Sequence, residues 1–128
     1  MTIFFNTNSM SELTKQDLHN LGMNIVGNDL KKNKFEFLAV NSDLKKKPQF
    51  IVKNTSGELI FIIVKTVAFP DEPSNYDAIW METFKVHAKS KNAKLFFAGV
   101  GLANSNDMEQ PLNHESGYII KYEGLKEI

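Results

Sequence analysis

The fold is decided by the segment Gln49-Phe50-Ile51-Val52-Lys53, the turn Asn54-Thr55-Ser56-Gly57 and the segment Leu59-Ile60-Phe61-Ile62-Ile63-Val64-Lys65. Two apolar segments joined by a short turn that contains glycine are typical of a β-hairpin, because glycine readily adopts a positive φ. The second segment does not alternate between polar and apolar residues, so we expect it to be buried on both faces. The sequence therefore predicts an antiparallel hairpin whose second strand lies in the centre of a sheet.

A helix and a strand are predicted before this hairpin. Apolar residues recur at helical spacing from Leu18 to Leu30, which indicates one apolar stripe. Ser11 and Thr14 are candidate N-caps, and Thr14 is followed three residues later by an acid, as in a capping box. Lysines at 31, 32 and 34 suit the C-terminus of this helix. Residues 35–40 then read as a strand.

The segments after the hairpin complete an α/β pattern. A loop over residues 70–75 leads into a helix that extends to about Ser90. We expect this helix to pack through one face, formed by Tyr76, Ile79, Trp80, Thr83, Phe84 and His87. Residues 95–100 read as a buried strand and residues 118–122 as a strand near an edge. The order is α-β-β-β-α-β-β, which predicts a mixed sheet flanked by two helices.

Composition limits the classes of protein to which the chain can belong. Its 128 residues suffice for one domain, which we place at residues 11–128 after a loose arm of residues 1–10. Fifteen acids balance fifteen lysines, so net charge gives no argument for a nucleic-acid-wrapping protein. The absence of cysteine excludes disulfides and iron–sulfur or zinc–thiolate sites. With no signal peptide or long apolar run visible, we expect a cytoplasmic protein without a membrane partner.

The hairpin resembles the PD-(D/E)XK core of restriction-endonuclease-like proteins. In that family a Pro-Asp opens one hairpin strand and Glu-x-Lys ends the next, and the core order is the α-β-β-β-α-β seen here. The resemblance implies a restriction-endonuclease-like fold for this domain. In active members the acids hold Mg²⁺ and the lysine assists the reacting water. Here Pro48 and Lys65 are retained, but the metal-ligand positions hold Met23, Gln49 and Ile63. The resemblance therefore implies a degenerate site without metal, cofactor or ordinary catalysis.

A second resemblance covers Leu18–Gly27, Phe35–Asn41 and Ala98–Asn104. These segments are similar to a small bacterial family whose members are often labelled as the flavin-carrying component of the sodium-translocating NADH-quinone reductase. That component needs cysteines for a [2Fe–2S] cluster and a large flavin module. A chain of this size without cysteine has neither, so we interpret the label as erroneous.

Lysines and one histidine are the candidate binding residues. Lys65 is either a relic of the nuclease motif or an anion contact. Lys45, Lys46 and Lys47 form one basic cluster, and a second cluster at residues 31–34 either joins it or is solvated separately. His87 shares a predicted helix face with aromatic residues, and a packed or rim position is favoured over a catalytic one.

The predicted function is that of a non-catalytic nuclease-fold protein that acts through binding or self-assembly, as a homodimer. Aromatic residues near the second helix would anchor such a dimer if part of their surface stays exposed. Two alternatives stay open. One is a nucleic-acid-binding module that uses the lysine clusters. The other is an unconventional metal-dependent nuclease with Asp43, Glu58 or Glu36 as displaced ligands.

Overall fold

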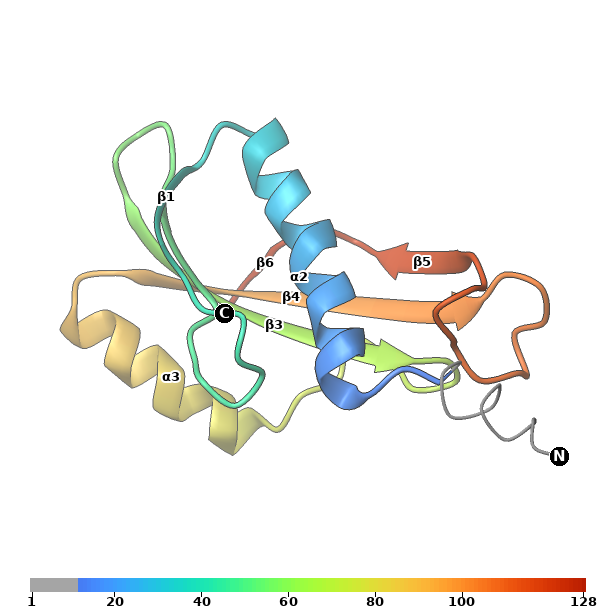
Figure 1. Cartoon of the computed structure of the whole chain (residues 1–128). Helices are drawn as coiled ribbons and strands as arrows, with labels where there is room; N and C mark the ends of the chain where they lie inside the picture. Colours follow the sequence, from blue (N-terminus) through green and yellow to red (C-terminus); the bar gives the residue numbers. More distant parts are fainter. Residues whose placement is uncertain (1–11) are drawn as a thin grey trace, which may run out of the picture.

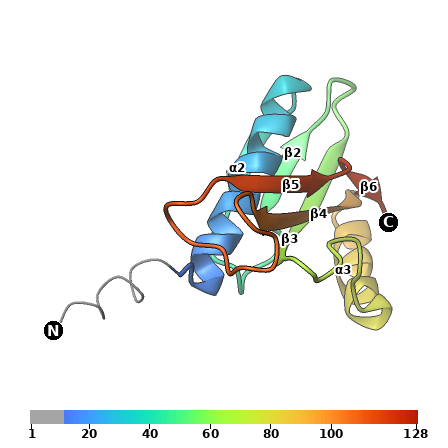
Figure 2. The ribbon, with the colours of Figure 1, turned by 90° about the vertical axis from the view of Figure 1, so that its right-hand side faces the viewer.

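A mixed β-sheet with one helix on each face forms the body of the molecule in the computed structural model, which describes residues 12–128 (Figures 1 and 2). The elements follow in the order α2 (Lys15–Lys32), β1 (Glu36–Val40), β2 (Phe50–Lys53), β3 (Leu59–Ala68), α3 (Ala78–Ser90), β4 (Lys94–Asn104), β5 (Tyr118–Tyr122) and β6 (Lys126–Glu127). The predicted arm at residues 1–10 lies outside the described residues. Neither of these helices has the length and apolar character needed to cross a bilayer.

The sheet combines a local meander with one crossover. Its strand order is β1-β2-β3-β4-β5, and β6 also pairs with β4, so the sheet has six strands. The pairs β1–β2 and β2–β3 are antiparallel, whereas β3 and β4 are parallel and are connected through α3. The predicted α/β class, mixed sheet and two flanking helices are therefore confirmed. The two-residue strand β6 is an addition that no sequence pattern indicated.

Helix α2 begins as its sequence predicts and covers one face of the sheet. The Thr14 side chain accepts a hydrogen bond from the Asp17 N–H, and the Asp17 carboxylate accepts one from the Thr14 N–H, which completes a capping box. The buried residues Met23, Val26 and Leu30 recur at helical spacing along its inner face. They pack in one core cluster with side chains of β2, β3 and β4: Phe50, Val52, Ile60, Ile62, Val64, Ala98, Val100 and Leu102.

Helix α3 covers the opposite face but through a different stripe from the predicted one. Its buried residues are Met81 and Ala88, with Phe84 partly buried between them. Ile79 is 82% exposed, and Trp80 and His87 are exposed as well. The predicted face was wrong because the helix begins after Asp77, whose side chain accepts a hydrogen bond from the Trp80 N–H, and the sheet meets the residues one position further along.

The two central strands are longer than predicted. Their parallel register runs without interruption from Ile60 opposite Lys94 to Ala68 opposite Leu102. Strand β2, in contrast, stops at Phe50 opposite Ile62. The last third of β3 therefore has β4 on one side and no strand on the other.

A glycine in α2 allows the helix to lie close to this part of β3. A Cβ atom at Gly22 would overlap the Thr66 hydroxyl oxygen and lie 2.8 Å from the Thr66 Cβ, which rotation of the side chain cannot move away. A Cβ at Gly27, five residues along the same helix, would lie 3.7 Å from its nearest neighbour, in ordinary contact. The helix and β3 are thus in contact at one glycine and have room at the other.

We expect Gly22→Ala to lower the free energy of unfolding by about 1–3 kcal/mol, because overpacking outweighs the helix propensity gained. The matched control Gly27→Ala should leave it unchanged or raise it by up to about 1 kcal/mol. Urea unfolding followed by circular dichroism measures both. Equal effects of the two substitutions would contradict the close contact between Gly22 and Thr66.

Candidate functional site

A hollow of about 570 Å³ lies along the unpaired part of β3. Its walls are the first turns of α2, the loop over residues 41–48, and the segment that leads into α3. The hollow is lined by Lys15, Leu18, His19, Leu44, Lys47, Val64, Lys65, Thr66, Val67, Ala68, Asp71, Tyr76, Asp77 and Trp80. Three lysines, one histidine and two aspartates therefore meet around one strand edge.

Gln49 marks the point at which β3 loses its neighbour. The Gln49 N–H donates to the Ile62 carbonyl over 3.0 Å, and its side-chain Oε1 accepts from the Val64 N–H over 2.8 Å. Alternate residues of a strand direct both backbone groups to the same side. The N–H and C=O of Thr66 therefore point to the same side as those of Ile62 and Val64, into the hollow. No described residue forms a hydrogen bond with these Thr66 groups.

The residues at the three metal-ligand positions of the nuclease resemblance have structural roles. Gln49 is completely buried, and its Nε2 also donates to the Lys46 carbonyl over 3.0 Å. Ile63 is completely buried in the core cluster beneath α3, and Met23 is buried in the cluster beneath α2. Within residues 12–128, no three His, Asp or Glu side chains gather in a group that would suit a metal ion.

Lys47 and Lys65 are brought together at the hollow. The Lys65 ammonium donates to the Asn75 carbonyl over 2.6 Å. The Lys47 ammonium donates to the Leu44 carbonyl over 2.9 Å and lies 5.5 Å from the centre of the Trp80 ring. Burial lowers the pKa of Lys47, and the charge of Asp43 partly opposes this effect.

The other predicted lysines are divided between two places. Lys45 and Lys46 are exposed on the loop that carries Lys47. Lys31, Lys32 and Lys34 lie at the C-terminal end of α2, whereas the loop is tied to the first turn, where Gln16 Nε2 donates to the Ser42 carbonyl over 2.8 Å. A helix of 18 residues separates these ends by about 27 Å. The two clusters do not form one patch.

His19 belongs to the hollow, and its importance was missed in the sequence. It is 5% exposed, and its Nε2 has no hydrogen-bond partner among the described residues; the same holds for the buried Thr66 hydroxyl. Burial lowers the pKa of His19, and the charge of Lys47 lowers it further. Its spacing to Met23 and Val26 places it on the inner stripe of α2, which is the signal that indicates its burial. His87, in contrast, contacts Phe61 at the other end of α3, with ring centres 5.9 Å apart.

The three displaced acids of the nuclease alternative do not meet. Glu58 precedes β3 and forms an ion pair with Lys94 at 3.0 Å. Seven residues of extended chain place it about 23 Å from Lys65 along the strand. Glu36 lies at the same far end, opposite Lys53. Asp43 alone lies beside the hollow, where its charge acts on His19 and Lys47.

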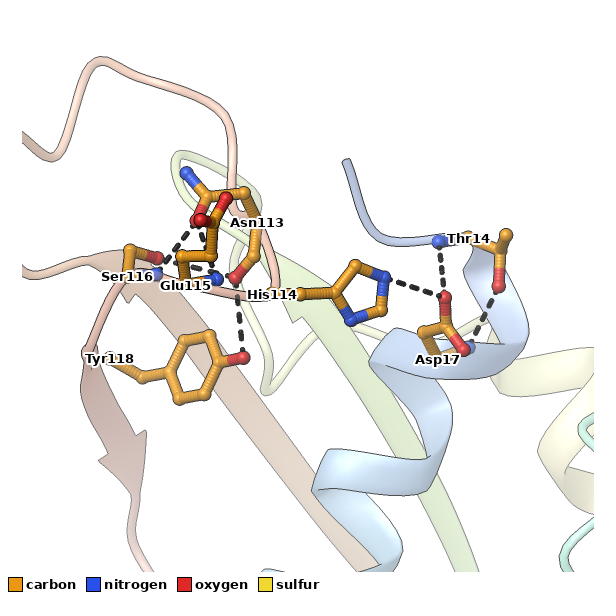
Figure 3. A network of polar contacts seen from close by, with 7 residues as sticks. All are labelled: Thr14, Asp17, Asn113, His114, Glu115, Ser116 and Tyr118. Atoms are coloured by element: carbon orange, nitrogen blue, oxygen red, sulfur yellow. Dashed lines mark hydrogen bonds and ion pairs between the residues drawn. The ribbon is translucent and has the colours of Figure 1, made fainter. Parts of the chain in front are cut away.

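A polar network holds the start of α2 against the loop that connects β4 and β5 (Figure 3). The His114 Nε2 lies 3.5 Å from the Asp17 carboxylate, which also accepts a hydrogen bond from the Thr14 N–H at 3.0 Å. The Asn113 side chain accepts from the Ser116 N–H, and the Tyr118 hydroxyl donates to the Asn113 carbonyl. The first turn of α2, which forms one wall of the hollow, is thereby tied to a second segment of the chain.

We expect Gln49→Leu to lower the free energy of unfolding by about 2–3 kcal/mol, because it leaves the buried Val64 N–H without a partner. The control Gln110→Leu changes an exposed glutamine and should stay within about 0.5 kcal/mol of the parent. Chemical denaturation of the three proteins measures the difference. A loss no larger than that of the control would show that this hydrogen bond is unimportant for stability.

We also expect the free energy of unfolding to fall as pH drops from 7.5 towards 5.5. The folded protein holds His19 neutral, so the unfolded chain binds a proton first, near the ordinary value of 6.5, and stability is lost below that pH. His19→Gln should flatten this dependence. Urea titrations of both proteins at pH 7.5, 6.5 and 5.5 make the comparison, and parallel curves would refute the role of His19.

The comparisons with known proteins give one family. A family model described as a domain of unknown function, DUF8840, matches residues 16–128. Neither the curated proteins nor the solved structures include a match to this chain. The matched range begins in the first turn of α2 and contains nearly all of that helix, the second helix and every strand described above. The chain therefore belongs to the DUF8840 family.

Proposed function

We propose that this protein is a catalytically silent nuclease-fold protein that acts by binding a partner in the hollow beside β3. One observation carries the proposal. The positions at which a nuclease would hold its metal ligands are occupied by side chains that the fold itself uses, Gln49 and Ile63, while the adjacent strand edge is open and bordered by lysines. Such a site has groups for recognition and lacks groups for metal-dependent hydrolysis.

The arrangement of elements supports the nuclease-fold part of the proposal. The order helix, three-stranded meander, helix, strand is the core order of restriction-endonuclease-like proteins. In this chain the two helices pack on opposite faces of the sheet. Ile63 and Lys65 project to the same face of β3, two residues apart, in the register that Glu-x-Lys has in the motif.

A second candidate function is nucleic-acid binding at the same hollow. Five lysines favour it, three in the lining and two on the adjoining loop: Lys15, Lys47, Lys65, Lys45 and Lys46. Three aspartates lie among them, at 43, 71 and 77, and the chain has no net charge, which weakens the attraction for phosphates. We therefore rank this function second.

Self-assembly is a further part of the proposal. Ile79 and Val86 are exposed one above the other, seven residues apart on the outer face of α3. The predicted homodimer would bury such side chains at a two-fold interface. It stays a prediction.

The nuclease question is tested with labelled single- and double-stranded DNA and RNA. The strands are incubated with the protein at low salt in Mg²⁺ or Mn²⁺, followed by fluorescence anisotropy and then run on a denaturing gel. We expect every strand to remain intact. Cleavage that Lys65→Ala abolishes would overturn the proposal. A rise in anisotropy that is salt-sensitive, lost in Lys47→Ala and retained in the distant control Lys32→Ala would favour the nucleic-acid function.

A further inference from the structure

We propose that the partner of the hollow, and thus of the proposed function on which this inference rests, is an extended peptide segment of another protein. It would add to β3 as a short strand and place an acidic side chain against Lys47 and Lys65. Recognition of this kind takes affinity from main-chain hydrogen bonds and specificity from alternate side chains.

The backbone of β3 offers a set of groups suited to a strand. By the alternation described above, the Val64 C=O, both groups of Thr66 and the Ala68 N–H point to the side where β2 has ended. The Ala68 C=O is already used, since it accepts from the Asp71 N–H over 3.0 Å. The open edge therefore matches the pairing groups of about three residues of an added strand.

The walls of the hollow indicate which side chains such a strand would carry. On β3, the side chains of Val64, Thr66 and Ala68 face α2, whereas Lys65 and Val67 face α3. An added strand continues these two faces. Its side chains directed to the α2 side would meet Leu18, and those directed to the α3 side would meet Lys65 and the Lys47–Trp80 pair.

Charge selects an acidic residue for the α3 side. Neither lysine ammonium forms an ion pair with a described carboxylate; each donates to a backbone carbonyl instead. Of the two aspartates in the lining, Asp77 is used as the N-cap of α3. A carboxylate from the partner would give these lysines the charge-assisted hydrogen bonds that they lack. The lowered pKa of Lys47, which burial causes, agrees with an ammonium that lacks an anion.

The test uses the full chain, labelled with ¹⁵N, and three synthetic heptapeptides with blocked ends. The first alternates valine and aspartate, the second alternates valine and lysine, and the third is the first peptide with methyl groups on alternate backbone nitrogens. Titration followed by amide hydrogen exchange reports on each residue of β3. We expect the valine–aspartate peptide to slow exchange of the Thr66 and Ala68 amides at least tenfold. The lysine peptide and at least one N-methyl register should lose this effect.

Lysine variants provide the second arm. Lys47→Ala and Lys65→Ala should each weaken binding of the valine–aspartate peptide about fivefold, whereas the exposed control Lys85→Ala should not change it. Circular dichroism verifies that the variants are folded, and the N-methyl peptides test the pairing in the unchanged protein.

Several outcomes would overturn the inference. They are the absence of binding, protection confined to the outer face of α3, equal binding of the acidic and basic peptides, and protection of Thr66 by duplex DNA instead of peptide. If these occur while nucleic acids stay intact in the nuclease assay, the inference fails and the proposed silent nuclease fold stands. Metal-dependent cleavage overturns the proposed function whatever the peptides do.

Discussion

The hydrogen bonds of Gln49 separate the paired part of β3 from its open part, and the arrangement of the hollow depends on this boundary. Its backbone continues the antiparallel ladder by one residue to Ile62, and its side chain then takes the Val64 N–H that the next strand residue would have taken. A buried amide suits this position because it accepts from Val64 and also donates to the Lys46 carbonyl. An ionised carboxylate has no proton for the second bond. The loop of residues 41–48 leaves the sheet at this point.

The beginnings of both helices meet at the boundary because of the order of the elements. Helix α2 starts near the C-terminal end of β3, and α3 starts after the loop that leaves the same end (Figure 1). Helix N-termini carry partial positive charge, which adds to that of the lysines. Asp17 and Asp77 compensate part of it as capping residues. The contact between Gly22 and Thr66 brings the α2 wall close to the strand.

Most of the fold was predictable because its signals are local. The capping box at Thr14, the turn at Gly57 and the unbroken apolar run of β3 each act over a few residues, and each predicted element exists. The inward face of α3 was not predictable from periodicity alone, because Ile79 and Met81 are both apolar and only the sheet decides which is covered. The length of β4 was also hidden, since Gly99 and Gly101 weaken a strand pattern. These glycines are explained by Pro73, whose carbonyl oxygen would overlap a Cβ at Gly99.

The candidate site was predictable only in part. Lys47 and Lys65 were named from the hairpin, whereas the open edge beside them depends on where β2 stops, which is a tertiary property. His19 was set aside because histidines were judged by their neighbours in sequence, and its surroundings come from the loop of residues 41–48 and from β3.

The complete burial of Gln49 and Ile63 also limits the evolution of this chain. A metal site of the nuclease type would need carboxylates at both positions, and each substitution alone would place an uncompensated charge or an unsatisfied hydrogen bond in the core. Natural domains have only about 5–15 kcal/mol of stability in reserve, so neither single step is readily tolerated and no metal is bound until both are made. The two positions therefore act as a ratchet: selection can alter the partner that the open edge recognises one residue at a time, but it cannot reach hydrolysis by the same route.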